Sequence, residues 1–366
     1  MFALLTAIYA VEAFAADTLV CNVKSVSDWA FYGSDKPSVV VSLVNMRKVQ
    51  KAYDMRCEIR DSRNRPLYEL GQRGIVSPVD SAEVSFTFKT VSPGFYDMLM
   101  YNGGRFIEDA VIAYEPEKIL DTVGGKEDFI LFAHKIALER REIRPQYVMV
   151  RNKEMSGREK NVYDFSMITR GDESVKGYIA FPKGKKGLGA MLTLVQRESA
   201  QLNNLADFTA PQDFVEMVIY LDRRGTGDDV MHNYLTDMLL ALDYLTQRDE
   251  IDKSSVYVQG SGYAGAAAFV ASAMADAVAG SMASAPDFSL LTDKYSVESI
   301  SRNVSAPVLM GAGLRNDADY LQAVFSIFNR VKGTKEYFVS PQSEEIERNR
   351  WKYIKDIFIK RLSGRQ

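Results

Sequence analysis

Strand-forming runs separated by turn residues fill the first third of the chain. Val, Ile, Leu and aromatic residues cluster in short stretches from about Thr18 to Tyr114, with Gly, Pro, Asn, Asp and Ser between them. This pattern predicts strands over 18–24, 38–43, 53–60, 66–70, 83–89, 95–101 and 105–114. Short strands with turns between them favour an all-β, immunoglobulin-like sandwich domain.

The pattern changes after the segment EPEK at 115–118, which we interpret as a linker. Apolar residues at helical spacing predict a helix over 126–143. Strands are predicted over 162–168, 175–181, 190–195, 215–221, 256–258, 280–285, 307–312 and 336–340, with helices over 234–248, 320–331 and about 344–362. Strands that alternate with helices predict an α/β domain with a mostly parallel, doubly wound sheet. The expected domains are therefore 16–115 and 116–366.

The segment VYVQGSGYAG at 256–265 has the layout of a nucleophile elbow. It combines a short apolar strand, a turn of small residues and an Ala-rich helix, and such a turn exposes a catalytic side chain above a parallel sheet. The elbow needs small residues two positions before the nucleophile and two and three positions after it. Gly260, Ala264 and Gly265 satisfy this requirement only if Gly262 occupies the nucleophile position.

A glycine at that position removes the reactive side chain and relaxes the turn. A nucleophile there is held at strained backbone angles that cost about 1–3 kcal/mol, whereas glycine adopts positive φ easily. The alternative interpretation is an ordinary Gly-rich turn that never carried a nucleophile.

Several motifs resemble the acetyl xylan esterase / cephalosporin-C deacetylase family of α/β-hydrolases, from about Pro116 onward. They are KEDF at 126–129, VKGY at 175–178, PKG at 182–184, DRRGTG at 222–227, YLTD at 234–237, ALD at 241–243, the elbow, and APVLMG at 306–311 with GL at 313–314. PGFY at 93–96 and EPEKI at 115–119 also resemble the N-terminal domain of some secreted members. The resemblance implies an α/β-hydrolase fold and carboxylic ester hydrolysis, in this case of carbohydrate esters.

The resemblance also indicates a degenerate catalytic triad. Active members use Ser, Asp and His in that chain order, and the matching positions here are Gly262, Asn316 and Glu345. The family's His-Gly turn, which helps to form the oxyanion hole, falls near Val195 and Gln196 and is absent.

The histidine positions support this hypothesis without an alignment. His134 and His232 are the two histidines of the chain, and both precede the elbow. An α/β-hydrolase has its general base after the nucleophile, near the last strand. Without that base a serine hydroxyl is a weak nucleophile at neutral pH.

Composition narrows the function classes. A net charge of -3 gives no electrostatic footprint for nucleic acid. Two cysteines, Cys21 and Cys57, exclude a zinc cluster or a disulfide-rich scaffold and leave one disulfide or two free thiols open.

Residues 1–15 are apolar and end in a small-x-small pattern, which predicts a signal peptide and a secreted or periplasmic protein. No later stretch is long enough to span a bilayer. Lys355, Lys360 and Arg361 are expected on a solvated helix face.

Three functional hypotheses follow. The first is a pseudoenzyme that binds a glycan, or serves as a complex subunit, through a cleft around Val195, Gln196, Glu198, Ser261 and Tyr263, with no cofactor or metal. The second is an active hydrolase with rebuilt chemistry, in which Ser261 acts with Arg197, Glu198 or Glu345, or in which Glu198, Glu345 and Asp317 bind a metal. The third is a structural protein whose domains present surfaces to a partner and bind no glycan.

Overall fold

A computed structural model describes residues 19–25, 30–31, 33, 36–61, 63–89, 92–120, 124–169, 174–196, 209–222, 228–340, 343 and 347–364. The chain divides into two compact units between Pro116 and Glu117. The predicted signal peptide, residues 1–15, lies outside the described residues.

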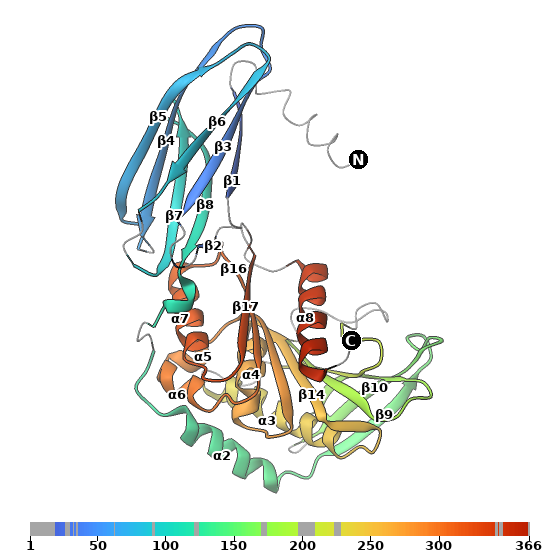
Figure 1. Cartoon of the computed structure of the whole chain (residues 1–366). Coiled ribbons are helices and arrows are strands. Elements are labelled where there is room, and N and C mark those ends of the chain that lie inside the picture. The colour runs from blue at the N-terminus through green and yellow to red at the C-terminus, as the bar shows by residue number, and fades with distance from the viewer. Residues whose placement is uncertain are drawn as a thin grey trace. The chain divides into compact units, whose positions relative to one another are not determined.

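The first unit contains two β-sheets (Figure 1). One sheet has the order β1-β3-β6 and the other β2-β8-β7-β4-β5. The strands are β1 (Val20–Ser25), β2 (Ala30–Phe31), β3 (Ser38–Asn45), β4 (Lys51–Asp61), β5 (Pro66–Val76), β6 (Asp80–Thr87), β7 (Gly94–Asn102) and β8 (Arg105–Tyr114). In β3, Val39, Val41 and Leu43 are fully buried, because alternate side chains of a strand point to opposite faces.

Both cysteines are free thiols in this unit. Cys21 lies in β1, and Cys57 lies buried in β4 of the other sheet. Burial raises the pKa of the Cys57 thiol to about 12. The structure therefore has two free thiols where the sequence left a disulfide open.

A nine-stranded sheet forms the centre of the second unit, in the order β17-β16-β15-β14-β12-β13-β11-β10-β9. The strands are β9 (Gln146–Asn152), β10 (Lys160–Ile168), β11 (Ser174–Pro182), β12 (Leu188–Gln196), β13 (Val215–Leu221), β14 (Ile251–Ser261), β15 (Val278–Pro286), β16 (Val308–Gly313) and β17 (Lys335–Ser340). Pairing is parallel from β13 through β17 and antiparallel among β9, β10, β11 and β13.

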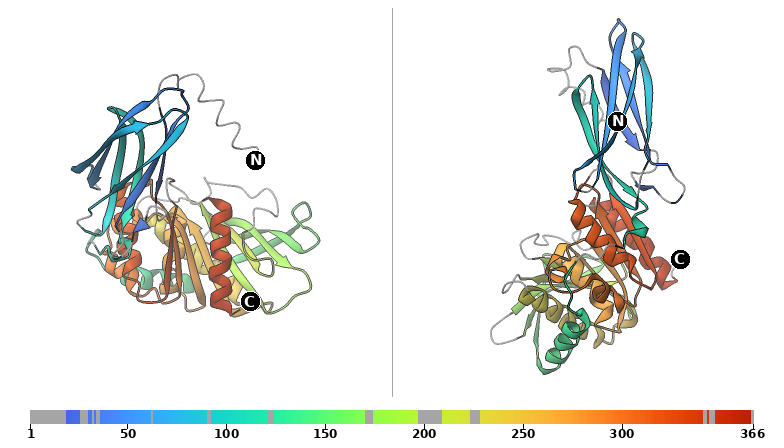
Figure 2. Two further views of the ribbon diagram at one scale, coloured as in Figure 1. Left: turned by 45° about the horizontal axis from the view of Figure 1, so that its top comes forward. Right: turned by 90° about the vertical axis from the view of Figure 1, so that its left-hand side faces the viewer.

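Helices lie on both faces of this sheet (Figure 2). They are α2 (Phe129–Glu142), α3 (Asp228–Thr246), α4 (Gly262–Val270), α5 (Ser289–Thr292), α6 (Val297–Arg302), α7 (Ala318–Asn329) and α8 (Arg348–Ser363). Helix α4 packs on β14 and β15, and it also contacts α3. Helix α8 packs on the other face, where Phe358 and Ile359 meet Met191, Tyr257 and Met282.

The order of the strands produces a crevice in the sheet. Strand β12 has β13 on one side and β14 on the other, so the chain first moves toward one edge and then crosses to the other. Ligands of open α/β sheets bind at the carboxyl ends of strands at such a reversal. The ends of β12 and β14 are therefore the place to look for a site.

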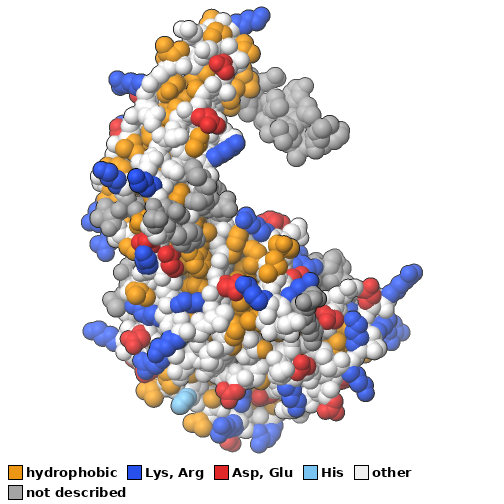
Figure 3. Space-filling model, viewed as in Figure 1, with side chains coloured by type: hydrophobic (Ala, Val, Ile, Leu, Met, Phe, Trp, Pro, Cys, Tyr) orange, Lys and Arg blue, Asp and Glu red, His pale blue; other side chains and the backbone are white. Residues whose placement is uncertain are grey.

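Two surface features bear on the predicted partners. Basic and acidic side chains are interspersed over the face of the molecule in Figure 3, in keeping with the small net charge. Among the described residues, no helix is both long enough and apolar enough to cross a membrane.

Candidate functional site

The elbow segment forms a sharp turn between β14 and α4. Val256 and Val258 are fully buried in the middle of the sheet, and the strand ends at Ser261 with φ −132°. The next residue, Gly262, has φ +58° and begins the helix. The backbone thus enters the left-handed region at Gly262, where glycine is favoured.

Close packing explains the small residues around this turn. A Cβ on Gly260 would lie 2.3 Å from the carbonyl oxygen of Ala264, and one on Gly265 would lie 3.2 Å from that of Gly260. The backbone of the strand end therefore touches the first turn of α4. The positive φ therefore falls on Gly262, and the close packing requires small residues at 260 and 265.

A cavity of about 440 Å³ opens beside the turn, at the carboxyl ends of β12 and β14. Its volume is within the range of small-molecule sites. We call it the elbow cavity, and its described lining consists of Thr193, Leu194, Val195, Gln196, Thr209, Gln259, Gly260, Ser261, Gly262, Ser284, Arg348, Trp351 and Lys355.

Lys355 is buried at the base of this cavity. Its side chain is 3% exposed, so the expectation of a solvated position on α8 was wrong. Nζ donates to Gln259 Oε1 and, over 3.2 Å, to Thr209 Oγ1. Lys360 and Arg361 are exposed, as expected.

A buried carboxylate, Glu216 on β13, completes the polar network. Glu216 Oε1 accepts a hydrogen bond from Thr193 Oγ1 over 2.9 Å, and Oε2 accepts one from the Ala210 amide over 2.8 Å. Gln259 Nε2 donates to Thr193 Oγ1 and Thr209 Oγ1, which connects Glu216 to Lys355. Burial lowers the pKa of Lys355 to about 8, and the charge of Glu216 opposes that shift.

Gln196 contributes a donor to the cavity. Its Nε2 is buried and has no hydrogen-bond partner among the described residues. A buried polar atom without a partner is uncommon in folded proteins. The amide group of Gln196 therefore has capacity to bind a ligand.

The other predicted cleft residues are only partly brought together. Ser261 is exposed and lines the cavity with Val195 and Gln196, whereas Tyr263 lies in α4 and is not among the described lining residues. Arg197, Glu198 and Glu345 lie outside the described residues.

Asn316 follows β16, and its Nδ2 donates to the Gly313 carbonyl over 3.0 Å. Asp317 caps α7 by accepting from the amides of Asp319 and Tyr320. Within the described ranges, no group of three or more His, Cys, Asp or Glu residues could hold a metal ion.

Neither histidine lines the elbow cavity. His232 in α3 makes a 2.7 Å hydrogen bond through Nε2 to Glu139 Oε2 of α2, and His134 is exposed on α2. The two helices belong to the layer that also contains α4, across the sheet from α8.

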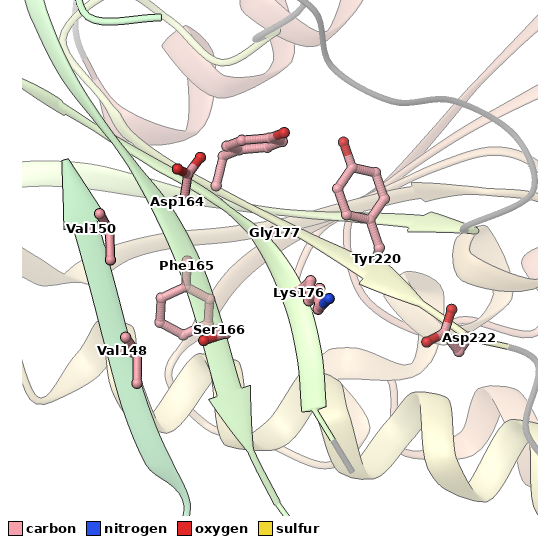
Figure 4. Close-up of a pocket in the computed structure, with 10 residues that line it drawn as sticks. Val148, Val150, Asp164, Phe165, Ser166, Lys176, Gly177, Tyr220 and Asp222 are labelled. Carbon is pink, nitrogen blue, oxygen red and sulfur yellow. The ribbon is translucent and has the colours of Figure 1, made fainter. Parts of the chain in front are cut away.

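A second hollow, of about 360 Å³, lies on the antiparallel part of the sheet. Figure 4 shows Val148 and Val150 on one edge strand, with Asp164, Lys176, Tyr220 and Asp222 around the hollow. The rings of Tyr178 and Tyr220 meet edge to face with their centroids 6.2 Å apart.

Comparison with known proteins identifies the fold of the second unit. No family model matches the sequence, and no curated protein matches it either. An acetyl xylan esterase from a Paenibacillus species superposes with a TM-score of 0.59 at 14% identity, covering 68% of this chain and 98% of that one. Acetyl xylan esterase 1 from a Thermoanaerobacterium species gives 0.58 at 15% identity, with the same coverage. The predicted resemblance is therefore confirmed at the level of the fold, which is that of α/β-hydrolases.

Proposed function

We propose that the chain is a secreted protein with an esterase-like fold that binds a carbohydrate in the elbow cavity and does not cleave it. The observation that carries the proposal is Gly262, which has φ +58° at the turn where an elbow presents its nucleophile. Glycine has no side chain that could attack an ester. Export by a signal peptide and an immunoglobulin-like sandwich in the first unit are part of the same proposal.

The other triad positions support loss of the chemistry. Asn316, at the position of the acid, donates a hydrogen bond from Nδ2 to the Gly313 carbonyl of the same turn, and Glu345 stands where a histidine is expected. No histidine follows residue 232 in the sequence. A serine hydroxyl without a positioned base is a poor nucleophile at neutral pH.

The composition of the cavity favours binding. Trp351 offers an aromatic ring, and Gln196, Ser261 and Thr209 offer amide and hydroxyl groups. Sites for small molecules combine apolar or aromatic walls with a few oriented polar groups. A sugar, which has apolar ring faces and many hydroxyls, matches that combination.

The test is hydrolysis of p-nitrophenyl acetate and acetylated xylan by the purified protein, with Ser261→Ala as the control. We expect no turnover above the control and binding of at least one saccharide on a glycan array. Turnover that disappears in Ser261→Ala would overturn the pseudoenzyme proposal. Absence of any glycan binding would instead favour a purely structural role or a subunit role in a complex.

One observation favours a second candidate, an active hydrolase that uses Ser261. Ser261 and Lys355 line the same cavity, and Lys355 has a pKa lowered to about 8 by burial. An amine with such a pKa is partly neutral at pH 7–8 and can accept a proton. In that case Ser261→Ala and Lys355→Met each abolish turnover, and the rate falls with protonation of an amine below about pH 8.

A further inference from the structure

We infer that the elbow cavity selects a saccharide that carries a carboxylate, such as a uronic acid, over a neutral sugar. The inference rests on the proposed binding function and adds the chemical class of the ligand. It follows from the charges, the hydrogen-bond donors and the aromatic ring that line the cavity.

The charged residues of the described lining are both cations. They are Arg348, at the start of α8, and Lys355, two turns further along the same face of the helix. No Asp or Glu is among the described lining residues. A cavity lined by one sign of charge raises the local concentration of ligands of the opposite sign. The described lining is therefore complementary to an anion.

Glu216 partly offsets the charge of Lys355, and it does so from outside the cavity lining. It is 1% exposed and is not a lining residue. Its oxygens accept from Thr193 Oγ1 and from the amides of Thr209 and Ala210. The carboxylate thus points into the network below the cavity, where it stabilises a buried ammonium group.

Two donors are available to an acceptor in the cavity. The Lys355 ammonium has three N–H groups, and the structure gives Nζ two acceptors, Gln259 Oε1 and Thr209 Oγ1. Gln196 Nε2 has none among the described residues. It lies 3.2 Å from the point that a Cβ on Gly262 would occupy, so it faces the turn. Charge-assisted hydrogen bonds from such donors to a carboxylate are stronger than those to a neutral hydroxyl.

Trp351 and the size of the cavity indicate a saccharide rather than a small anion. The ring lines the same cavity of about 440 Å³, one turn of α8 from both Arg348 and Lys355. A carboxylate at Lys355 would therefore place the rest of a sugar ring beside Trp351. The second hollow differs, because its charged lining is Asp164, Asp222 and Lys176 (Figure 4).

The experiment compares trigalacturonate with its fully methyl-esterified form by isothermal titration calorimetry on the full chain. The two probes share the same sugars and differ in charge. We expect trigalacturonate to bind at least tenfold more tightly, with an affinity that falls as salt is added because the attraction is electrostatic.

Two pairs of variants locate the effect. Ser261→Asp adds a negative charge to the cavity rim and should weaken trigalacturonate binding at least tenfold. Ser261→Asn, whose side chain has the shape of Asp without the charge, should not. Arg348→Gln should weaken binding, whereas Lys360→Gln, which removes the same charge from an exposed position of α8, should leave it unchanged. None of these variants alters the buried network, so each is expected to fold.

The outcomes separate the inference from the function on which it rests. Equal or tighter binding of the methyl ester would overturn the carboxylate preference and leave carbohydrate binding intact. If neither probe binds and no saccharide on the glycan array binds, both the carboxylate preference and the proposed carbohydrate binding are overturned. Acetate should displace trigalacturonate only at much higher concentrations. If acetate competes at the concentration at which trigalacturonate binds, the site recognises a free carboxylate, and the proposal that it recognises a saccharide is overturned.

Discussion

Gln196 Nε2 lies 3.2 Å from the point where a Cβ on Gly262 would sit. A side chain introduced at the turn would therefore meet an amide donor from the end of β12, and the turn itself would become strained. This relationship makes the proposed loss of the nucleophile testable in the reverse direction.

Gly262→Ser should destabilise the second unit and should not create an esterase. A residue with a Cβ at φ +58° costs about 1–2 kcal/mol relative to glycine. The new hydroxyl would still lack a histidine base. Urea unfolding, followed by Trp fluorescence, and a p-nitrophenyl acetate assay measure the two effects. Esterase turnover by Gly262→Ser would show that a base is already in place.

Gly260→Ala should be more damaging than a substitution at the next residue. Its Cβ would lie 2.3 Å from the Ala264 carbonyl oxygen, which is backbone and cannot rotate away. We expect a loss of about 2–4 kcal/mol. Ser261→Ala is the matched control, because Ser261 is exposed and makes no cap hydrogen bond, and its effect should stay within about 0.5 kcal/mol. Equal stabilities would mean that the turn relaxes freely.

Lys355→Met should destabilise the packing of α8. The change removes the buried ammonium group that is linked to the Glu216 carboxylate through Thr209, and loss of one of two oppositely charged buried groups costs up to about 3–5 kcal/mol. Glu216→Gln in the same chain should recover part of that loss, whereas Lys360→Met should have little effect. A double-mutant cycle by urea unfolding measures the coupling. Additive effects would show that Lys355 and Glu216 act independently.

The contribution of Lys355 to stability should rise with pH. Its pKa is about 8 in the folded protein, against 10.5 as the ordinary value. Between these values the unfolded chain binds more protons, so the free energy of unfolding increases with pH. The gain is on the order of 3 kcal/mol at pH 10.5 relative to pH 8. It should appear as a difference between the wild type and Lys355→Met, and parallel pH profiles would contradict the buried ammonium.

The two thiols should react slowly with a disulfide reagent until the first unit unfolds. Cys57 is fully buried with a pKa raised to about 12, and burial also raises the pKa of Cys21. Thiolate is the reactive form, so Ellman's reagent at pH 8 should react slowly with the native protein. Two equivalents should react in guanidinium chloride without a reductant. No reaction there would reveal a disulfide.

Much of the α/β unit could be predicted from the sequence because its strands are buried on both faces. Continuous apolar runs gave β13 at its observed bounds, Val215–Leu221, and placed β16 and β17 within a residue or two. Strand β9 was missed although Pro145 precedes it: Val148 and Val150 are exposed on an edge strand, so the segment has no buried apolar run. The start of α8 was placed at about 344, whereas Glu347 caps it.

The elbow could be predicted because its chemistry is local, and the rest of the cavity could not. The spacing of Gly260, Gly262 and Gly265 is enough by itself to predict a tight turn. Arg348 and Trp351 from α8, Gln259 from β14 and Thr209 from the segment before β13 reach the same cavity from three separate parts of the chain. One signal was available for Lys355: it occurs in an apolar stripe with Trp351, Phe358 and Leu362, at the spacing of one helix face. A charge within such a stripe, like Glu216 within the apolar strand β13, indicates a buried polar partner.

Helix α8 follows all nine strands of this sheet in the sequence, and it carries the ammonium group that is linked to Glu216 through Thr209. During synthesis the sheet face under α8 stays uncovered, with Tyr257 and Met282 exposed, until α8 has left the ribosome. A nascent or truncated chain that lacks Arg348–Ser363 would present that face to chaperones and proteases. Quality control would thus recognise an incomplete molecule at the sheet face that lies beside the elbow cavity.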